Sequence, residues 1–213
     1  MADNFYLAGD SETGGLTTDQ DLLTLYLAIV DEDLRVLEEL DLKLKPNENR
    51  LPLAEAGALK VNGIDLHKHL ADPETITYGE AKTKIVAMVK KYLKKKGRYS
   101  NVRPLFYNVS FDIGFIQAHV LPAEEWNSLI SYNVVDPKVV VNFLKDCNYF
   151  PPDLGSLVSV VKHFNVPMQG SAHTAKVDTL ATIEVYKKIL ELMANKKDSG
   201  GQSVDLVSLL ESE

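Results

Sequence analysis

Two acidic residues near the N-terminus stand two positions apart, in the run DSE at 10–12. On a β-strand, residues two apart project to the same face, so both carboxylates can reach one site. The spacing alone is not specific, because DPE at 72–74 repeats it. The first run follows directly on the apolar stretch 5–9 and leads into two glycines, and α/β folds place chemistry at such strand ends. Asp10 and Glu12 are therefore candidate site residues, with a solvated turn as the alternative.

A further carboxylate, Asp112, lies in the run YNVSFDIGF, where we expect a strand to feed into a helix. Its neighbours are apolar, and an ionised carboxylate is costly to bury without a partner. A cation or a hydrogen-bond donor should therefore lie beside it. The alternative is an ordinary first-turn aspartate, stabilised by the helix dipole.

His173 and Asp178 lie in the run SAHTAKVDTLATIEVY. The histidine stands at or just before the start of the expected C-terminal helix, and the aspartate follows one and a half turns later among apolar residues. Because the pKa of histidine lies near working pH, His173 can accept a proton during a reaction. The alternative is a structural histidine with ordinary hydrogen bonds.

The three segments together provide four carboxylates and a histidine, each beside apolar sequence at the edge of an expected element. Hard divalent cations such as Mg²⁺ or Mn²⁺ prefer oxygen ligands. Two such ions about 3.5–4 Å apart activate water and stabilise the departing oxygen in phosphodiester hydrolysis. The combination predicts a phosphodiesterase site with two ions.

The elements that must position these residues follow from hydrophobic patterning. Three strands open the chain and predict an antiparallel meander, and later strands add to the sheet in parallel, with helices on its faces. The expected strands are 5–9, 22–30, 34–45 and 103–109, with a short one near 134–136. The expected helices are a short one near 53–60 within the loop 46–77, then 78–96, 110–121, 138–147, one with Asp153 as N-cap, and 175–195. The expected fold class is α/β, with a mixed central sheet flanked by helices.

No repeat or change of composition divides residues 1–195, so we expect one domain there. From residue 196 the run KKDSGGQS reads as a flexible linker, followed by the short acidic and aliphatic tail VDLVSLLESE. With the two residues before it, as QSVDLVSLLESE from Gln202, the tail loosely resembles the Gln-led peptides that dock on sliding clamps, although it lacks their terminal aromatic residue. It is therefore a candidate contact for a replication or repair protein.

Composition narrows the class of protein. The chain has 213 residues, 45% of them hydrophobic and 25% charged, and a net charge of −7, which argues against a protein that coats nucleic acid through its overall field. No apolar run is long enough to cross a bilayer, and no secretory signal begins the chain. Cys147 is the only cysteine, which excludes an internal disulfide and favours a cytoplasmic location. We expect Cys147 to be a small buried residue.

The ordered set DSET-GGL, NVSFD and HTAKVD resembles the DnaQ-like, or DEDDh, family of 3′→5′ exonucleases, over roughly residues 4–190. This resemblance implies an RNase H-like fold. It also implies that Asp10, Glu12, Asp112 and Asp178 hold two metal ions and that His173 is the general base. A tyrosine at the position of His173 would have marked the sister DEDDy group.

The resemblance also implies substrate contacts. Thr13 and Leu16 match positions that touch the terminal nucleotide, although Leu16 could equally be a core leucine. Asn108 and Phe111 flank the second motif and are candidates for contacting substrate or shaping the pocket. Asp136 resembles a supporting acidic position, with helix capping as the alternative. The pair Ala8–Gly9 before the first motif is less bulky than the aliphatic pair usual in the family.

A pocket that removes one nucleotide at a time must admit an unpaired terminus, so single-stranded 3′ ends are the expected substrate, with DNA favoured over RNA. An exoribonuclease and a non-catalytic accessory protein are the alternatives. The run KKYLKKKGR at 90–98 is the main basic segment. It could guide a phosphate backbone or be a solvated helix face.

Overall fold

A mixed β-sheet forms the centre of the protein, as expected. The computed structural model describes residues 4–48, 50–167 and 174–198. The strand order is β4-β3-β2-β1-β5, with β1 antiparallel to β2, β2 antiparallel to β3, and the pairs β3–β4 and β1–β5 parallel. The strands are β1 (Phe5–Thr13), β2 (Leu22–Val30), β3 (Val36–Lys45), β4 (Thr75–Thr77) and β5 (Val102–Leu105).

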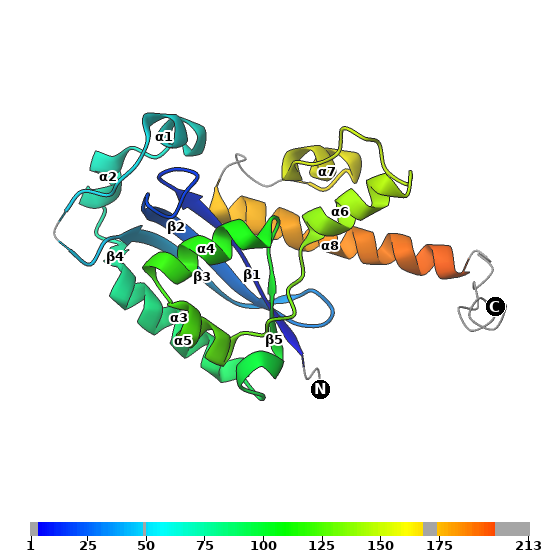
Figure 1. Ribbon diagram of the computed structural model, residues 1–213, viewed down its shortest axis with the longest axis horizontal. Helices are drawn as coiled ribbons and strands as arrows, with labels where there is room; N and C mark the ends of the chain where they lie inside the picture. Colours follow the sequence, from blue (N-terminus) through cyan, green and yellow to red (C-terminus); the bar gives the residue numbers. More distant parts are fainter. Residues whose placement is uncertain (1–3, 49, 168–173, 199–213) are drawn as a thin grey trace, which may run out of the picture.

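Helices cover both faces of this sheet (Figure 1). The helices α3, α4 and α5 pack on one face, and α8 packs on the other and also contacts α6 and α7. The helices are α1 (Ala56–Asn62), α2 (Leu66–Ala71), α3 (Tyr78–Tyr92), the 3-10 helix η1 (Gly97–Tyr99), α4 (Val109–His119), α5 (Ala123–Leu129), α6 (Pro137–Asp146), α7 (Leu157–His163) and α8 (Ala175–Asp198).

The alternation of side chains along β2 explains why this strand is apolar on both faces. Leu25 and Leu27 point into the core under α3 and α4, whereas Tyr26 and Ala28 point into the core under α8. A strand that lies between β1 and β3 and is covered on both faces has no solvent side, so its sequence reads as a continuous apolar run. The sequence prediction for 22–30 is confirmed.

The first strand is longer than expected. It was predicted to end at residue 9, but β1 continues through Thr13 because Asp10, Ser11 and Glu12 pair with Tyr26, Leu25 and Thr24 of β2. The polar residues therefore belong to a strand and not to a turn. Their alternation between the two faces of the sheet is a fixed geometric property.

The stretch 46–77 holds more structure than the predicted loop and single short helix. Gly63 adopts the left-handed φ of 68° that ends α1, and the side chain of Asp65 then accepts the first backbone N–H groups of α2. The chain next forms β4, which pairs in parallel with β3. The glycines and prolines of this stretch thus separate short elements.

Several predicted boundaries differ from the structure. The helix expected over 78–96 ends at Tyr92, α5 was not predicted, and the strand near 134–136 is a single bridge between Leu105 and Val135. Ser156, rather than Asp153, caps α7, since its side chain accepts from the N–H of Ser159. Cys147 is exposed after α6, contrary to the expectation that it is buried. Within the described residues, no helix is long and apolar enough to span a membrane.

Candidate active site

The acidic end of β1 extends beyond its neighbour β5. The two strands pair only from Phe5 opposite Val102 to Ala8 opposite Leu105. After Leu105 the chain leaves the sheet and starts α4 four residues later. Residues 10–12 of β1 therefore lie where the first turn of α4 approaches the strand.

The even-numbered residues of β1 face α8. Ala8 packs in the same apolar cluster as Ala175 of α8, so Asp10 and Glu12, two and four residues further on, point to that face as well. There they meet Asp178, which lies in the first turn of α8. One carboxylate oxygen from each of the three residues lies within 4.8 Å of the others.

Small residues allow α8 to come this close to the sheet. Ala8 and Ala28 stand opposite each other on β1 and β2, and both are fully buried against Ala175. Beside them, Lys176 donates from Nζ to Glu39 Oε1 at 2.8 Å and lies 5.3 Å from the centre of the Tyr26 ring. These contacts fix the start of α8, and with it Asp178, against β1.

Ser11 faces the other side of the sheet, where α4 begins. Its hydroxyl donates to Oδ1 of Asp112 at 2.6 Å, and its backbone N–H also stabilises that carboxylate. Asp112 is 3% exposed. Carboxylates thus reach the end of β1 from both faces of the sheet. Sequence reasoning missed Ser11, although a small hydroxyl residue between two strand carboxylates was the available signal.

Asp136 holds the start of α4 in place. Its two carboxylate oxygens accept the backbone N–H groups of Asn108 and Val109, each at 3.0 Å. Oδ1 also accepts the N–H of Lys138, which makes Asp136 the N-cap of α6. The alternative of helix capping is therefore confirmed, and the same carboxylate also holds the start of the helix that carries Asp112. Asn108 takes the left-handed φ of 72°, which asparagine tolerates well.

The site carboxylates raise one another's pKa values. Burial raises the pKa of Asp10 well above its usual range, and the negative charge of Asp112 adds to this effect. Burial, with repulsion from Asp178, raises the pKa of Glu12 to about 7. Burial also raises the pKa of Asp112 to about 7, although the hydrogen bonds from Ser11 oppose that shift. Like charges crowded in a partly buried site resist ionisation unless a cation joins them.

The residues present fit divalent cations. Each of the four side chains offers oxygen atoms, which Mg²⁺ and Mn²⁺ prefer, and their mutual repulsion would be relieved by bound positive charge. The run with the same spacing at 72–74 is different. Asp72 and Glu74 contact Lys43, at 2.5 and 3.2 Å, and this lysine lowers the pKa of Asp72. Two pairs of acidic residues with equal spacing thus have different surroundings. Asp72 and Glu74 pair with a lysine, whereas Asp10 and Glu12 lie among other carboxylates.

The loop between β1 and β2 carries the predicted nucleotide contacts. Thr13 is buried and donates from its hydroxyl to the carbonyl of Gly15 at 2.6 Å. Leu16 is 84% exposed, so the alternative of a core leucine is wrong. Gly14 allows the close approach of the segment 50–55, because a Cβ there would lie 2.3 Å from the carbonyl oxygen of Leu53.

A buried aspartate anchors this loop. The carboxylate of Asp21 accepts from Arg50 at 2.5 and 2.9 Å, from the N–H of Leu53 at 2.6 Å and from the hydroxyl of Tyr78 at 3.1 Å. These hydrogen bonds lower its pKa, in opposition to the effect of burial. The sequence analysis did not identify Asp21 or Arg50, because 29 residues separate the two partners.

Two of the remaining predicted site residues are placed near Asp112. Phe111 is half-buried on α4, with its ring centre 5.0 Å from that of Phe115. The side-chain oxygen of Asn108 accepts from Lys138 Nζ at 3.2 Å. The predicted general base, His173, lies outside the described residues, directly before Thr174, whose carbonyl accepts the N–H of Asp178.

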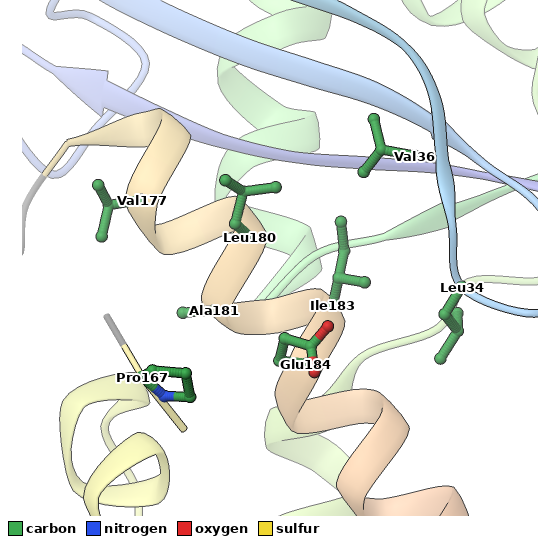
Figure 2. Close-up of a pocket in the computed structure, with 8 residues that line it drawn as sticks. All are labelled: Leu34, Val36, Pro167, Val177, Leu180, Ala181, Ile183 and Glu184. Carbon is green, nitrogen blue, oxygen red and sulfur yellow. The ribbon is translucent and has the colours of Figure 1, made fainter. Parts of the chain in front are cut away.

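Two hollows flank the first turns of α8. One, of about 430 Å³, starts at Glu12 and is lined further by Thr24, Asp41, Lys43, Asn62, Ile64, Thr174, Ala175, Lys176, Val177 and Leu180. The other, of about 410 Å³, is mostly apolar and is shown in Figure 2, where Leu34 and Val36 lie on one side of α8 and Pro167 on the other. Val177, Leu180, Ala181, Ile183 and Glu184 complete this second hollow. Of these two hollows, only the first is lined by a residue of the acidic cluster, Glu12.

Comparisons with known proteins bear on the fold. No family model and no curated protein matches the chain. Among solved structures, the chain is similar to E. coli exonuclease I in complex with a dT13 oligonucleotide, with a TM-score of 0.68 and a sequence identity of 19%. The match covers 92% of this chain and 43% of the exonuclease I chain. The zinc-bound form of an E. coli ExoI–ssDNA complex gives a TM-score of 0.67 and 22% identity, and the match covers 86% of this chain and 40% of the ExoI chain. A complex named ExoI/SSB-Ct gives 0.65 and 20%, with the same coverage.

The chain therefore spans about two fifths of the length of the proteins that it resembles. At these identities the likeness concerns the fold. The protein has an α/β, RNase H-like fold, with its mixed sheet flanked by helices, as the sequence predicted.

Proposed function

We propose that the protein is a DnaQ-like, DEDDh-type exonuclease that removes nucleotides from single-stranded 3′ ends by metal-dependent hydrolysis. The observation that carries this proposal is the convergence of Asp10, Glu12 and Asp178, with oxygens within 4.8 Å of one another, at the end of β1. Buried Asp112 stands at the same strand end, on Ser11. Carboxylates with raised pKa values gathered in one place are typical of functional sites, and bound cations would offset their mutual repulsion.

The four carboxylates would hold two ions, Mg²⁺ or Mn²⁺, as their oxygen donors favour. Such ions, when bound, supply positive charge for the phosphate oxygens and lower the pKa of water. The chain's own residues have separate tasks. Asp10 and Glu12 would present their oxygens from the strand, Ser11 would orient Asp112 and favour its ionised form, and His173 would take the proton from the attacking water.

Substrate binding would involve the loop after β1 and the hollow at Glu12. Leu16 exposes an apolar side chain beside the site, suited to contact with an unpaired base, and Asp21 keeps its loop in place. The similar solved structures include complexes with single-stranded DNA, which supports DNA over RNA as the substrate. Asn108 and Phe111, which lie near Asp112, remain proposed contacts to the substrate. The linker and tail were predicted over residues 196–213, but α8 continues to Asp198, so the first three of these residues are helical. The remainder, 199–213, lies outside the described residues and stays a proposed linker and partner-binding tail.

The deciding experiment uses matched DNA and RNA single strands, labelled at either the 3′ or the 5′ end, with Mg²⁺, Mn²⁺ or EDTA. We expect a ladder that shortens from the 3′ end, disappears in EDTA and is lost in Asp10→Ala. Asp72→Ala, which removes an aspartate from the equally spaced pair, is the matched control and should cleave normally. Unchanged cleavage by Asp10→Ala would exclude the proposal, and a preference for RNA would favour an exoribonuclease.

A second variant tests the proposed base. We expect His173→Ala to bind Mn²⁺ as the parent does but to turn over about 10²–10⁴-fold more slowly, which is the usual contribution of a general base. Metal binding can be followed by calorimetry and turnover with the labelled strand. Parental turnover in His173→Ala would remove the histidine from the mechanism and leave the metal site standing.

A further inference from the structure

A second surface with exposed aromatic rings and positive charge lies far from the acidic cluster. We call it the basic aromatic surface and define it by Lys94, Lys95, Lys96, Arg98, Tyr99, Arg103 and Tyr132. It is formed by the end of α3, η1, the start of β5 and the segment after α5, near the end of the molecule where β1 begins (Figure 1). Arg103 pairs with Tyr6 on β1, which is four residues, or about 13 Å, from Asp10 along the strand.

The aromatic part of this surface is ordered around a guanidinium group. Tyr99 and Tyr132 are 65% and 52% exposed, and their ring centres lie 6.1 Å apart in an edge-on arrangement. The guanidinium carbon of Arg98 lies 5.2 Å from the centre of one ring and 5.0 Å from that of the other. Both rings are thus held in position while much of their area remains open to solvent.

Buried hydrogen bonds hold the lysine segment rigid. The side chain of Asn101, which is 3% exposed, accepts the N–H groups of Lys94 and Lys95 at 2.8 and 3.1 Å and donates to the carbonyl of Tyr92 at 3.0 Å. Gly97 then adopts a φ of 72°, which turns the chain so that Arg98 returns towards Tyr132. Little backbone freedom is left to be lost on binding, which favours affinity.

The positive charge of this surface is largely available. Within the described residues, no ion pair is formed by Lys95, Lys96 or Arg98, and all three are exposed. The neighbouring Lys91, by contrast, pairs with Glu38 at 2.5 Å. In a chain with a net charge of −7, a cluster of unneutralised cations marks a local reversal of sign.

We propose that the basic aromatic surface binds single-stranded nucleic acid. Unstacked bases would pack on the open faces of Tyr99 and Tyr132, and the phosphate backbone would follow the lysine segment and Arg98. Proteins that bind single strands without sequence preference combine these two features, aromatic platforms for the bases and cations for the backbone. A duplex hides its base faces and would leave the tyrosines without a partner. An acidic peptide would use the charge and not the ring faces.

This surface goes beyond the proposed active site. The two lie at opposite ends of β1, so one strand would have to extend several nucleotides from its 3′ end to reach both. The surface would therefore retain long strands between cleavage steps and contribute nothing to the cleavage of very short ones.

The test is direct binding with catalysis blocked. In EDTA and in the Asp10→Ala background, the anisotropy of a fluorescent oligothymidylate of about 20 nucleotides would be titrated with protein, a length that exceeds usual single-strand site sizes. The double variant Tyr99→Ala/Tyr132→Ala should bind about 5- to 150-fold more weakly for each base that was stacked. Tyr99→Phe/Tyr132→Phe should keep parental affinity, because phenylalanine retains the stacking face. Tyr149→Ala, at another exposed tyrosine, is the matched control.

The charges are tested by salt. Lys95→Gln/Lys96→Gln should make the dependence of log K on log salt shallower by about 0.7 per lysine that contacts a phosphate. Lys84→Gln, at an exposed lysine in the middle of α3, should leave this dependence unchanged. Parental affinity in the double alanine variant would overturn the proposal, as would stronger binding of duplex or of polyglutamate than of the single strand. With Asp10 intact and Mg²⁺ or Mn²⁺ present, the same surface variants should cleave a trinucleotide at the parental rate, so the failure of this surface and of the active site can be told apart.

Discussion

The two ends of β1 lie beside clusters of opposite charge. At one end Asp10, Glu12, Asp112 and Asp178 gather negative charges that repel one another and raise the pKa values of Asp10 and Glu12. At the other end the guanidinium group of Arg98 lies over two tyrosine rings, and the neutral amide of Asn101 holds the backbone of the lysine segment. The acidic end is therefore costly to assemble without cations, whereas the basic end adds little to the cost of folding. The proposed metal site and the proposed strand-binding surface therefore differ both in the sign of their charge and in the cost of assembling it.

The comparison is tested most strongly by neutralising one acid. We expect Glu12→Gln to lower cleavage about 10³-fold, since cation-held charge stabilisation is worth several kcal/mol. The same change should raise the melting temperature in EDTA at neutral pH, because it removes one repelling charge. Glu74→Gln is the control and should do neither. A melting temperature that falls in Glu12→Gln would show that the acids are not in conflict.

The pH dependence of stability is the next test. Burial raises the pKa of Glu12 to about 7 in the folded state, above its usual value of 4.5, so the folded protein binds more protons than the unfolded chain between these values. The free energy of unfolding of the metal-free protein should therefore fall as pH rises from about 4.5 to about 7. Denaturant titrations in EDTA would measure it, and Mn²⁺ should reverse the trend. A rise in stability over this window without metal contradicts the prediction.

A smaller effect is expected at Ser11. Its hydroxyl stabilises ionised Asp112, so Ser11→Ala should raise the pKa of that carboxyl further. The acidic limb of the pH–rate profile should move to higher pH, with activity about 10-fold lower at neutral pH, since a hydrogen bond to a charged group contributes roughly 1.5 kcal/mol or more. Ser110→Ala, an exposed serine on α4, is the control. A profile that does not move would show that this hydrogen bond plays no part in the activity.

The smallest effect is expected at the basic end. Lys95→Gln/Lys96→Gln should change the free energy of unfolding by less than about 0.5 kcal/mol, as for most surface substitutions. Urea titrations of the parent and the variant at neutral pH would measure it. A large gain in stability would mean that these lysines repel one another as strongly as the acids do, and the contrast between the two ends would disappear.

The sequence could predict the elements whose information is local. The continuous apolar run at 22–30 identified β2, the alternation along 34–45 identified β3, and helical spacing identified α3 and α8. It could also predict that Asp10 and Glu12 share a face, because that follows from strand geometry alone. The continuation of β1 through Thr13 could not be predicted, since it depends on pairing with β2.

Contacts between distant segments were beyond local patterns. Ser11 and Asp112 are 101 positions apart, and nothing in either run identifies the other. The lack of a side chain at Gly9 also depends on a contact with a distant segment of the chain. A Cβ there would lie 2.5 Å from the ring of Phe106, so the ring of a residue beyond β5 fills the space that a larger side chain would occupy.

The shared carboxylate of Asp136 has a mechanical consequence. It binds the backbone at the start of α4 with both oxygens and the start of α6 with one of them. Moving either helix relative to the other must break charged hydrogen bonds at their common junction. A force applied to α6, as by a protein that docks on it, would therefore be transmitted to the turn of α4 that carries Asp112. The two helices would move together.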